Sequence, residues 1–354
     1  RKFTFKPGSI PQIIDHQRGR LHIRNQIGMG NFANVFSVSF TPRDSTDQRN
    51  VAMKINQFEH KSEENQYLKS SIEREAQALR KISDYVADSG KESFIAECLF
   101  SDDLGPNFHF MIMPMYSTDL KDLIIRNKLL FADILNIKTL ARQLFQALDV
   151  LSSMNPPVIH CDVTPANIMV ESISPLKIRL SDFGCCEEGN KQNQESDYIV
   201  TRWYRPPEIV LGCPYGPPVD MWGVGCTLFE THSRNYLFAG DFNKHMFYLH
   251  AGLIGPIPIS FFESIPVQIR TKLPVVLIDN QYHFTFDEKK LNHLLLSKQK
   301  FDHFFPKNSS GSSSSEDDSS GSDFREFLKN IFTWSPEERL TPSQALMHPF
   351  LAIP

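Results

Sequence analysis

The chain has 354 residues, a formal net charge of −4, 22% charged residues and 41% hydrophobic residues. This length allows one large domain or two lobes, and the composition is that of a soluble globular protein. The weakly acidic balance gives no sign of bulk nucleic-acid binding. No apolar run approaches the roughly 18 residues of a membrane span. The six cysteines show no C-x-x-C spacing and are interpreted as reduced thiols of an intracellular protein.

Residues 1–20 mix charges with proline and glycine, and we expect them to form a strap on the folded domain. From Leu21 an alternating pattern predicts a strand, and a second alternating run covers residues 35–40. Between them, Gly28 and Gly30 carry no Cβ, so backbone N–H groups there can approach phosphates closely. A G-x-G pair alone is more often a plain hairpin turn. A Rossmann motif is disfavoured because these glycines open a strand rather than a helix.

The run V-A-M-K-I at residues 51–55 places Lys54 among apolar strand residues. A lysine there either reaches water along its aliphatic stem or needs a charged partner. Residues 62–82 are predicted to form a helix with Ile72, Ala76 and Leu79 on one face, and Glu75 lies beside that stripe. Glu75 is therefore the candidate partner of Lys54.

Two further apolar stretches, residues 94–100 and 108–113, are predicted to complete a small antiparallel sheet. The segment P-M-Y-S-T-D-L that follows reads as a connector to a helical second part. Residues 132–153 carry apolar side chains at helical spacing, which predicts a long buried helix.

The most informative stretch runs over residues 158–184, V-I-H-C-D-V-T-P-A-N-I-M-V followed by K-I-R-L-S-D-F-G. Asp162 and Asn167 precede one short apolar strand, and Asp182 follows the next. Two strands joined by a turn can hold these oxygen-bearing groups around one small volume. Such a group suits Mg²⁺, which takes a few carboxylates plus substrate phosphates. For any one of these residues alone, turn chemistry is the simpler interpretation.

This stretch resembles the catalytic loop and the metal-binding D-F-G of protein kinases. The H-C-D at residues 160–162 and the segment Y-I-V-T-R-W-Y-R-P-P-E at residues 198–208 resemble the CMGC group. Within it they favour the branch of the dual-specificity tyrosine-regulated, LAMMER, SR-protein and pre-mRNA-processing kinases. The resemblance covers residues 21–352.

The resemblance implies an α+β bilobal kinase fold. Its small antiparallel β-sheet N-lobe with one helix would span about residues 21–115, and its larger, mostly α-helical C-lobe about residues 116–352. Residues 252–323 resemble the CMGC insert. Inside them the Ser-rich acidic segment 308–323 is predicted to be disordered because it cannot bury a core.

The resemblance also implies Mg-ATP binding in the cleft between the lobes and γ-phosphoryl transfer to Ser or Thr of proteins. Asp162, Lys54 and Thr164 would be catalytic, and Asn167 and Asp182 would bind the metal. Met113 would be the gatekeeper of the adenine pocket. The nucleotide-binding residues would be Ile27, Gly28, Gly30, Val35, Ala52, Lys54, Glu75, Met113, Pro114, Tyr116, Asp119, Asn167 and Asp182.

Three positions depart from the kinase pattern: Ala33 replaces the third loop glycine, Cys161 an arginine and Thr164 a lysine. That lysine normally neutralises charge on the transferred phosphoryl group, and losing one such donor costs on the order of 10²–10³ in rate. We expect a slower enzyme. The alternative is a pseudokinase-like binding scaffold with weak or no phosphotransfer.

A phosphate on Tyr198 would carry about −1.5 to −2 charges and would be clamped by Arg202 and Arg205. A packed, unmodified tyrosine is an equally good interpretation. Glu208 with Arg339, and Asp220 in D-x-W-x-x-G, are predicted structural braces. The resemblance implies protein substrates, either proline-directed or Arg/Ser-rich, a monomer without nucleic-acid or membrane partners, and a location in the nucleus or cytoplasm.

Overall fold

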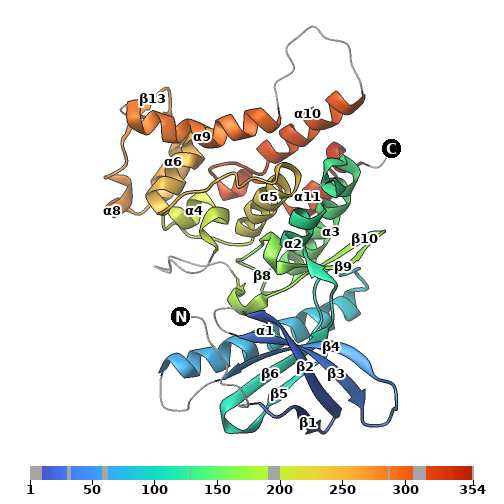
Figure 1. The fold of residues 1–354 in the computed structure, drawn as a ribbon. Coiled ribbons are helices and arrows are strands. Elements are labelled where there is room, and N and C mark those ends of the chain that lie inside the picture. Colours follow the sequence, from blue (N-terminus) through green and yellow to red (C-terminus); the bar gives the residue numbers. More distant parts are fainter. Residues whose placement is uncertain are drawn as a thin grey trace. The chain divides into compact units, whose positions relative to one another are not determined.

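The computed structural model describes residues 10–29, 33–57, 63–127, 129–189, 200–285, 288–305 and 316–352. Figure 1 gives the order of the elements along the chain. Within these stretches, no helix combines the length and the apolar character that crossing a membrane requires.

The chain divides into two compact units, neither of which is continuous in sequence. The first unit consists of Arg1–Lys91, Ile95–Ser117 and Ser181–Cys186. The second consists of Glu92–Phe94, Thr118–Leu180 and Glu187–Pro354. The short segment around Asp182 therefore groups with the β-rich unit.

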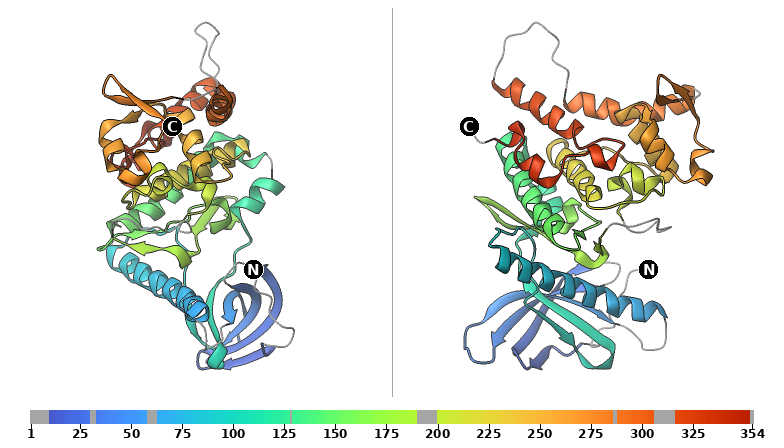
Figure 2. Two further views of the ribbon diagram at one scale, coloured as in Figure 1. Left: turned by 90° about the vertical axis from the view of Figure 1, so that its left-hand side faces the viewer. Right: turned by 180° about the vertical axis from the view of Figure 1, so that it is seen from behind.

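The first unit is an antiparallel sheet with one long helix, as predicted for the N-lobe. The strand order is β1-β2-β3-β4-β6-β5, and the helix α1 lies along the sheet against β4 and β6 (Figures 1 and 2). The bounds are β1 Ile13–His16, β2 Gly19–Met29, β3 Asn34–Pro42, β4 Arg49–Gln57, α1 Glu63–Ser89, β5 Phe100–Asp103 and β6 Phe108–Pro114.

Alternation along the strands divides the side chains of this sheet between two faces. Met53, Ile55 and Ile112 belong to a buried apolar cluster on one face. Lys54 and Met111, which pair directly across β4 and β6, alternate with these residues and therefore belong to the opposite face. A one-residue slip would exchange the faces, so the apolar cluster fixes the register.

The strand β1 at residues 13–16 forms a hairpin with β2, which corrects the expectation of a strap for this part of residues 1–20, whereas residues 1–9 lie outside the described residues. Ile14 pairs with Leu21, and both side chains are buried. Gly19 has φ +146°, and a Cβ there would lie 2.2 Å from the Thr41 carbonyl oxygen, so the close approach of β2 and β3 requires glycine. Only one side chain of β1 is buried, which leaves too short a pattern to detect in the sequence.

The predicted strand over residues 94–100 is also wrong in its extent, because β5 begins only at Phe100. Upstream, the carbonyl of Ser93 accepts from Arg179 Nη1 at 2.7 Å, and that of Phe94 accepts from the Leu180 N–H at 2.7 Å. These groups therefore bond to the second unit, to which residues 92–94 belong.

The helix α1 is longer than predicted. It runs past the predicted end at residue 82 and stops before Gly90, which has φ +65°.

The second unit is mostly helical, and short strand pairs connect its helices. The helices are α2 Leu120–Arg126, α3 Ile134–Ser153, α4 Pro207–Val210, α5 Pro218–Ser233, α6 Asn243–Ile254, α7 Ile259–Ser264, α8 Val267–Arg270, α9 Glu288–Phe304, α10 Glu316–Lys329 and α11 Pro342–Leu346. The strands are β7 Thr118–Asp119, β8 Val158–Ile159, β9 Ile168–Ile173, β10 Leu176–Leu180, β11 Glu187–Glu188, β12 Ile257–Pro258, β13 Val275–Ile278 and β14 Gln281–Phe284.

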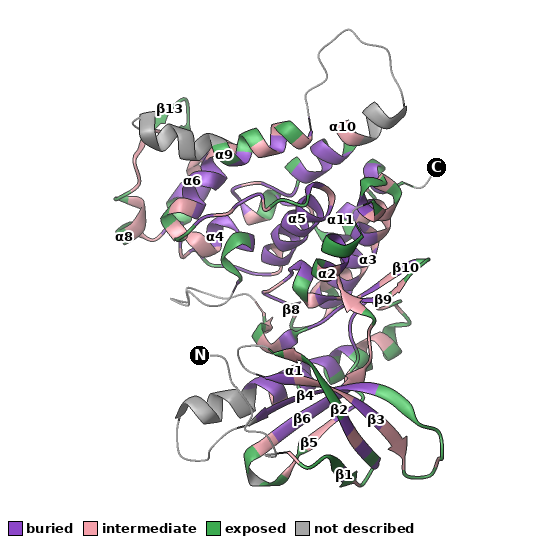
Figure 3. Ribbon diagram, in the orientation of Figure 1, coloured by how far each residue is buried: buried purple, intermediate pink, exposed green. Residues whose placement is uncertain are grey.

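The helices α3 and α5 form the centre of this unit. The apolar stripe predicted for α3 is buried, from Ile137 through Leu151, and α5 is buried along nearly its whole length (Figure 3). Trp222 of α5 packs its ring 5.2 Å from that of Phe238 and 5.0 Å from that of Phe332. This burial on all sides places α5 inside the unit, where it supports its neighbours from within.

The region resembling the CMGC insert is folded where the structure describes it. It contains α7, α8, a three-stranded sheet in the order β12-β14-β13, and α9. Of the segment 308–323, predicted to be disordered, residues 308–315 lie outside the described residues, and 316–323 begin α10. Phe324, Phe327 and Leu328 of α10 are fully buried, and their packing extends the helix into a polar sequence that would not form one alone.

Glu208 and Arg339 form the predicted brace inside the second unit. Arg339 donates to Glu208 Oε1 at 2.8 Å and to Oε2 at 3.0 Å, and both side chains are fully buried. Arg339 also donates to the Pro218 carbonyl at 2.8 Å and stands 5.2 Å over the Trp222 ring.

We expect Arg339→Leu to lower the free energy of unfolding by about 3–5 kcal/mol, because it leaves the Glu208 carboxylate buried without its partner. The matched control is Arg126→Leu, which removes an exposed pair with Asp122 at 2.7 Å and is expected to cost less than about 1 kcal/mol. Urea unfolding of both variants checks this, and equal losses would contradict it.

Candidate active site

The sheet of the first unit brings five predicted nucleotide-binding residues onto adjoining strands. Gly28 pairs with Val35, Val35 with Lys54, and Ala52 with Met113. Paired residues share a face, as do residues two apart on one strand, so the side chains of Val35, Lys54, Ala52 and Met113 form one continuous patch. Ala52 is buried and Met113 half-buried. This patch offers an apolar surface with a single ammonium group.

Of the other predicted residues of this unit, Ile27 lies at an irregular point of its strand. Ile27 lies where the register shifts between Gln26 and Gly28, and it is 51% exposed. Gly30 lies outside the described residues. Pro114 ends β6 opposite Val51, and Tyr116 follows it, half-buried. The predicted connector therefore begins at the end of the strand that carries Met113.

Lys54 is held by two carboxylates from different parts of the chain, as the sequence predicted for one of them. Its Nζ donates to Glu75 Oε2 at 2.7 Å and to Asp182 Oδ1 at 2.8 Å. Glu75 comes from α1, and Asp182 follows β10 in the segment that belongs to this unit. The Glu75 side chain is 2% exposed, whereas that of Asp182 is 49% exposed, so Asp182 is the carboxylate accessible from solvent.

The charges of this cluster are coupled. Burial lowers the pKa of Lys54, but Asp182 and Glu75 together outweigh burial and raise that pKa above its ordinary value. Burial raises the pKa of Glu75, and the Lys54 ammonium opposes this rise. Lys54 therefore remains charged, which a phosphate-binding lysine requires. The backbone of Asp182 is left-handed, with φ +64°. This conformation is unfavourable for a residue with a side chain, and it persists only where the surrounding structure imposes it.

In the second unit, Asp162 and Asn167 form the predicted catalytic loop. Asn167 Nδ2 donates to the Asp162 carbonyl at 2.9 Å and to Asp162 Oδ2 at 2.8 Å. Asp162 Oδ1 accepts from the Thr201 N–H at 3.2 Å. Thr201 belongs to the activation segment, the stretch between Asp182 and Glu208, and the sequence did not predict this contact. Because the amide nitrogen of Asn167 is used in this way, its oxygen is the atom of the amide that can bind a metal.

Asp220 of α5 holds this loop in an unusual conformation. Its Oδ2 accepts from the His160 N–H at 2.7 Å and its Oδ1 from the Cys161 N–H at 2.9 Å. Cys161 has φ +67°, which is costly for a residue with a side chain. Gly223 lets the loop approach α5, since a Cβ there would lie 3.1 Å from Val163. The brace predicted from D-x-W-x-x-G is therefore present.

Thr164 is buried, and its carbonyl accepts from the Asn167 N–H at 3.0 Å. The hydrogen bond to Asp162 that the sequence permitted is not found among the described residues. Thr164 therefore shapes the loop through its backbone.

Asp119 caps α2 by accepting from the Asp122 N–H at 2.8 Å. This is a structural use of a residue that was predicted to bind the nucleotide.

Of the predicted regulatory residues, Tyr198 lies outside the described residues and Arg202 is exposed. Arg205 is buried, and it donates from Nε to the Val200 carbonyl at 2.7 Å and from Nη1 to Asn243 Oδ1 at 2.8 Å. These contacts hold the end of the activation segment, and the clamping of a Tyr198 phosphate by Arg205 stays a prediction. No sequence pattern pointed to Asn243.

Comparison with known proteins agrees with this geometry. The protein kinase domain family matches residues 21–351. The chain belongs to the protein kinase family. The kinase is 30% identical to the dual specificity tyrosine-phosphorylation-regulated kinase 3 of Rattus norvegicus over 68% of the chain and 41% of that protein. The chain is 27% identical to the DYRK-family kinase pom1 of Schizosaccharomyces pombe, over 95% of the chain and 28% of that protein.

It is also 36% identical to the serine/threonine-protein kinase prp4 of Schizosaccharomyces pombe, over 38% of the chain and 28% of that protein. The matched region is thus less than half the length of each of these relatives. They belong to the branch of the CMGC kinases indicated by H-C-D and by the end of the activation segment, so that prediction is confirmed.

The carboxyl group of Asp220 gives this kinase a measurable pH dependence. Burial raises its pKa from 3.8 to about 6, against the lowering effects of His160 and the two N–H groups. The folded state therefore binds this proton more tightly than the unfolded state, and the stability it contributes is lost as the pH rises through about 6.

Relative to Asp220→Asn, the wild type should lose about 3 kcal/mol of unfolding free energy between the ordinary aspartate pKa and neutral pH. Urea unfolding of both proteins across that range measures the difference. A difference that stays constant or grows with pH would contradict the assignment.

Proposed function

We propose that this chain transfers the γ-phosphoryl group of ATP to serine or threonine hydroxyls of protein substrates. The observation that carries the proposal is the Lys54 ammonium held at 2.7 and 2.8 Å by Glu75 and Asp182 in a member of the kinase family. A buried lysine with two carboxylates is a prepared site for phosphates and a metal ion.

In this mechanism Lys54 binds the α- and β-phosphates, and Glu75 keeps the ammonium directed toward them. Asp162 orients the substrate hydroxyl and accepts its proton while the hydroxyl oxygen bonds to the γ-phosphorus and the bond to the β-phosphate oxygen breaks. Asn167, bonded at 2.8 Å to Asp162, keeps that carboxylate in place.

The donors available for a metal fit Mg²⁺. The half-exposed carboxylate of Asp182 and the amide oxygen of Asn167 are hard oxygen ligands, the type that Mg²⁺ prefers. When bound, Mg²⁺ neutralises charge on the phosphates. The chain's own contribution is to position these two oxygens, through the turn at Asp182 and the hydrogen bonds of Asn167.

The alternative function is a scaffold that binds nucleotide or protein with little chemistry. Thr164 favours it, because this buried, uncharged residue stands where kinases use a lysine. Against it, Lys54, Glu75, Asp162, Asn167 and Asp182 are all present, and a scaffold has no chemical need for the whole set.

Turnover of radiolabelled ATP on a protein substrate tests the proposal. We expect Lys54→Met and Asp182→Asn each to lower kcat/KM at least about a hundredfold, whereas Lys298→Met, at an exposed position on α9, leaves it unchanged. If wild type and both variants are equally silent while Mg-ATP still raises the melting temperature, the scaffold is the better description.

Mass spectrometry of an active sample tests autophosphorylation on Tyr198, and an unmodified active protein would refute it.

The contact between Arg205 and Val200 favours proline-directed substrates over Arg/Ser-rich ones. The Val200 carbonyl already accepts from Arg205. If the residue after the phosphoacceptor packs against this segment, its N–H lacks an acceptor there, and an unmet buried N–H costs about 1–3 kcal/mol. Proline has no N–H and avoids this cost.

A Ser-Pro peptide should therefore be phosphorylated at least about tenfold more efficiently, in kcat/KM, than the matched Ser-Ala peptide. A peptide of Arg-Ser repeats serves as the competing substrate in the same assay. Preference for that peptide, or equal rates with Pro and Ala, would contradict the assignment.

A further inference from the structure

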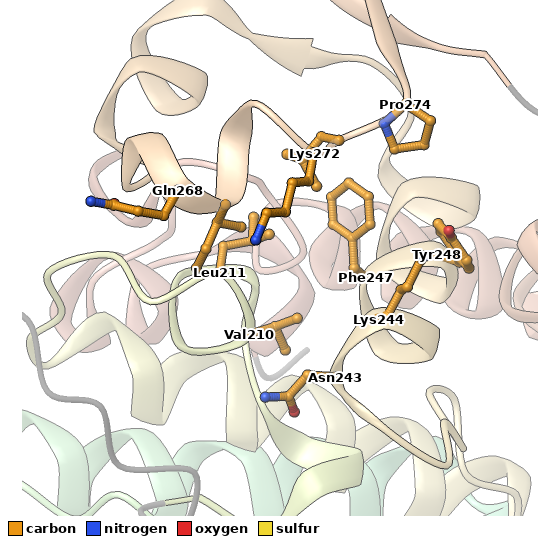
Figure 4. A pocket seen from close by; sticks show the side chains of 11 residues that line it. Val210, Leu211, Asn243, Lys244, Phe247, Tyr248, Gln268, Lys272 and Pro274 are labelled. Atoms are coloured by element: carbon orange, nitrogen blue, oxygen red, sulfur yellow. The ribbon is translucent and has the colours of Figure 1, made fainter.

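A cavity of about 290 Å³ lies in the second unit, away from the catalytic loop in sequence. Its apolar lining includes Leu211 after α4 and Phe247 of α6 (Figure 4). Ile269 of α8 and Leu273 in the turn after it also line the cavity. Leu211 and Phe247 belong to a buried core cluster against which Ile269 and Leu273 pack. The walls are therefore preformed parts of the core.

The rim of this cavity is positively charged. Lys244 and Lys272 line it, and no acidic side chain is among the described residues of its lining. Both lysines are exposed, and neither has an ion-pair partner in the part of the chain that the structure describes. Lys244 lies in the first turn of α6, where the helix dipole makes a cation unfavourable, so stability of the fold does not account for it.

The cavity also adjoins the activation segment. Asn243 lines it (Figure 4), and the same side chain accepts from Arg205 Nη1 at 2.8 Å. Arg205 in turn holds the Val200 carbonyl. A molecule bound in the cavity thus contacts a residue two hydrogen bonds from the end of the activation segment.

Size and charge together define the occupant. A volume near 290 Å³ is at the lower limit for small-molecule sites and suits one large side chain with part of its flanking backbone. Beyond Pro274 at the rim, the strand β13 adds Val276, Leu277 and Ile278, each about half exposed, along which an extended chain can continue. The unpaired lysines call for anionic groups beside the apolar anchor.

We propose that this cavity, together with Lys244 and Lys272, is a docking site for an extended acidic peptide segment of a partner protein. The segment inserts one aromatic or large aliphatic side chain against Leu211 and Phe247 and places flanking carboxylates or phosphates on the two lysines. Docking at this position tethers a phosphoacceptor next to the activation segment; that part of the inference rests on the proposed function, whereas the binding itself does not.

Fluorescence anisotropy on the full chain tests the binding. The probe is a fluorescein-labelled peptide with one phenylalanine flanked on each side by Glu and Asp; its controls replace the phenylalanine by alanine or the acidic residues by lysine. We expect saturable binding of the acidic probe only. The double variant Lys244→Glu/Lys272→Glu should weaken it about tenfold or more, while Lys298→Glu, a lysine reversed elsewhere on the surface, should not.

Absence of saturable binding to the wild type, equal binding of the alanine control, or equal loss with Lys298→Glu would each overturn the proposal. Displacement of the probe by oleate but not by the unlabelled acidic peptide would overturn it in favour of a lipid site.

Kinetics separate this proposal from the catalytic one. A Ser-Pro peptide extended by the acidic segment should show a KM about tenfold lower than the short peptide, and the double variant should abolish that ratio. If the chain proves inactive but the charge-dependent binding holds, the docking site stands and the proposed function fails. If the chain is active and the ratio is unity, docking of substrates fails.

Discussion

An ammonium group held against the face of a sheet is the constraint on which the first unit depends. Lys54 alone would be unfavourable among apolar neighbours, and it is tolerated because Glu75 and Asp182 supply opposite charges at hydrogen-bond distance. One carboxylate comes from α1 and the other from the segment after β10, so the ion pairs fix the position of both relative to β4. The same geometry leaves Asp182 half exposed, which makes it suitable as a metal ligand.

A second constraint acts in the helical unit, where a strained loop is held by a buried helix. Cys161 adopts a positive φ because Asp220 accepts from its N–H and from that of His160. Asp220 is in turn fixed in α5, whose burial is the main feature of that unit. The position of Asp162 thus depends on the packing of α5, a helix that is buried along nearly its whole length.

The activation segment and α6 are linked through one arginine. Arg205 joins the Val200 carbonyl to Asn243 of α6, and α6 forms a wall of the cavity rimmed by Lys244 and Lys272. The Val200 carbonyl and the proposed docking site are therefore connected by two hydrogen bonds inside one unit. Residues of the insert between 268 and 274, in α8 and the turn after it, complete that cavity.

The sequence by itself determined the elements whose signal is local: the buried stripe of α3, the strand around Lys54, and the order of Asp162, Asn167 and Asp182 around two short strands. Only the tertiary structure decided the hairpin of β1, the late start of β5, the helix begun by residues 316–323, and the partners of Arg205. Each of these depends on groups distant in sequence, such as Thr41 beside Gly19 or Asn243 beside Arg205. A periodic pattern records which side of an element is buried, but it carries no information about which distant atoms complete its hydrogen bonds.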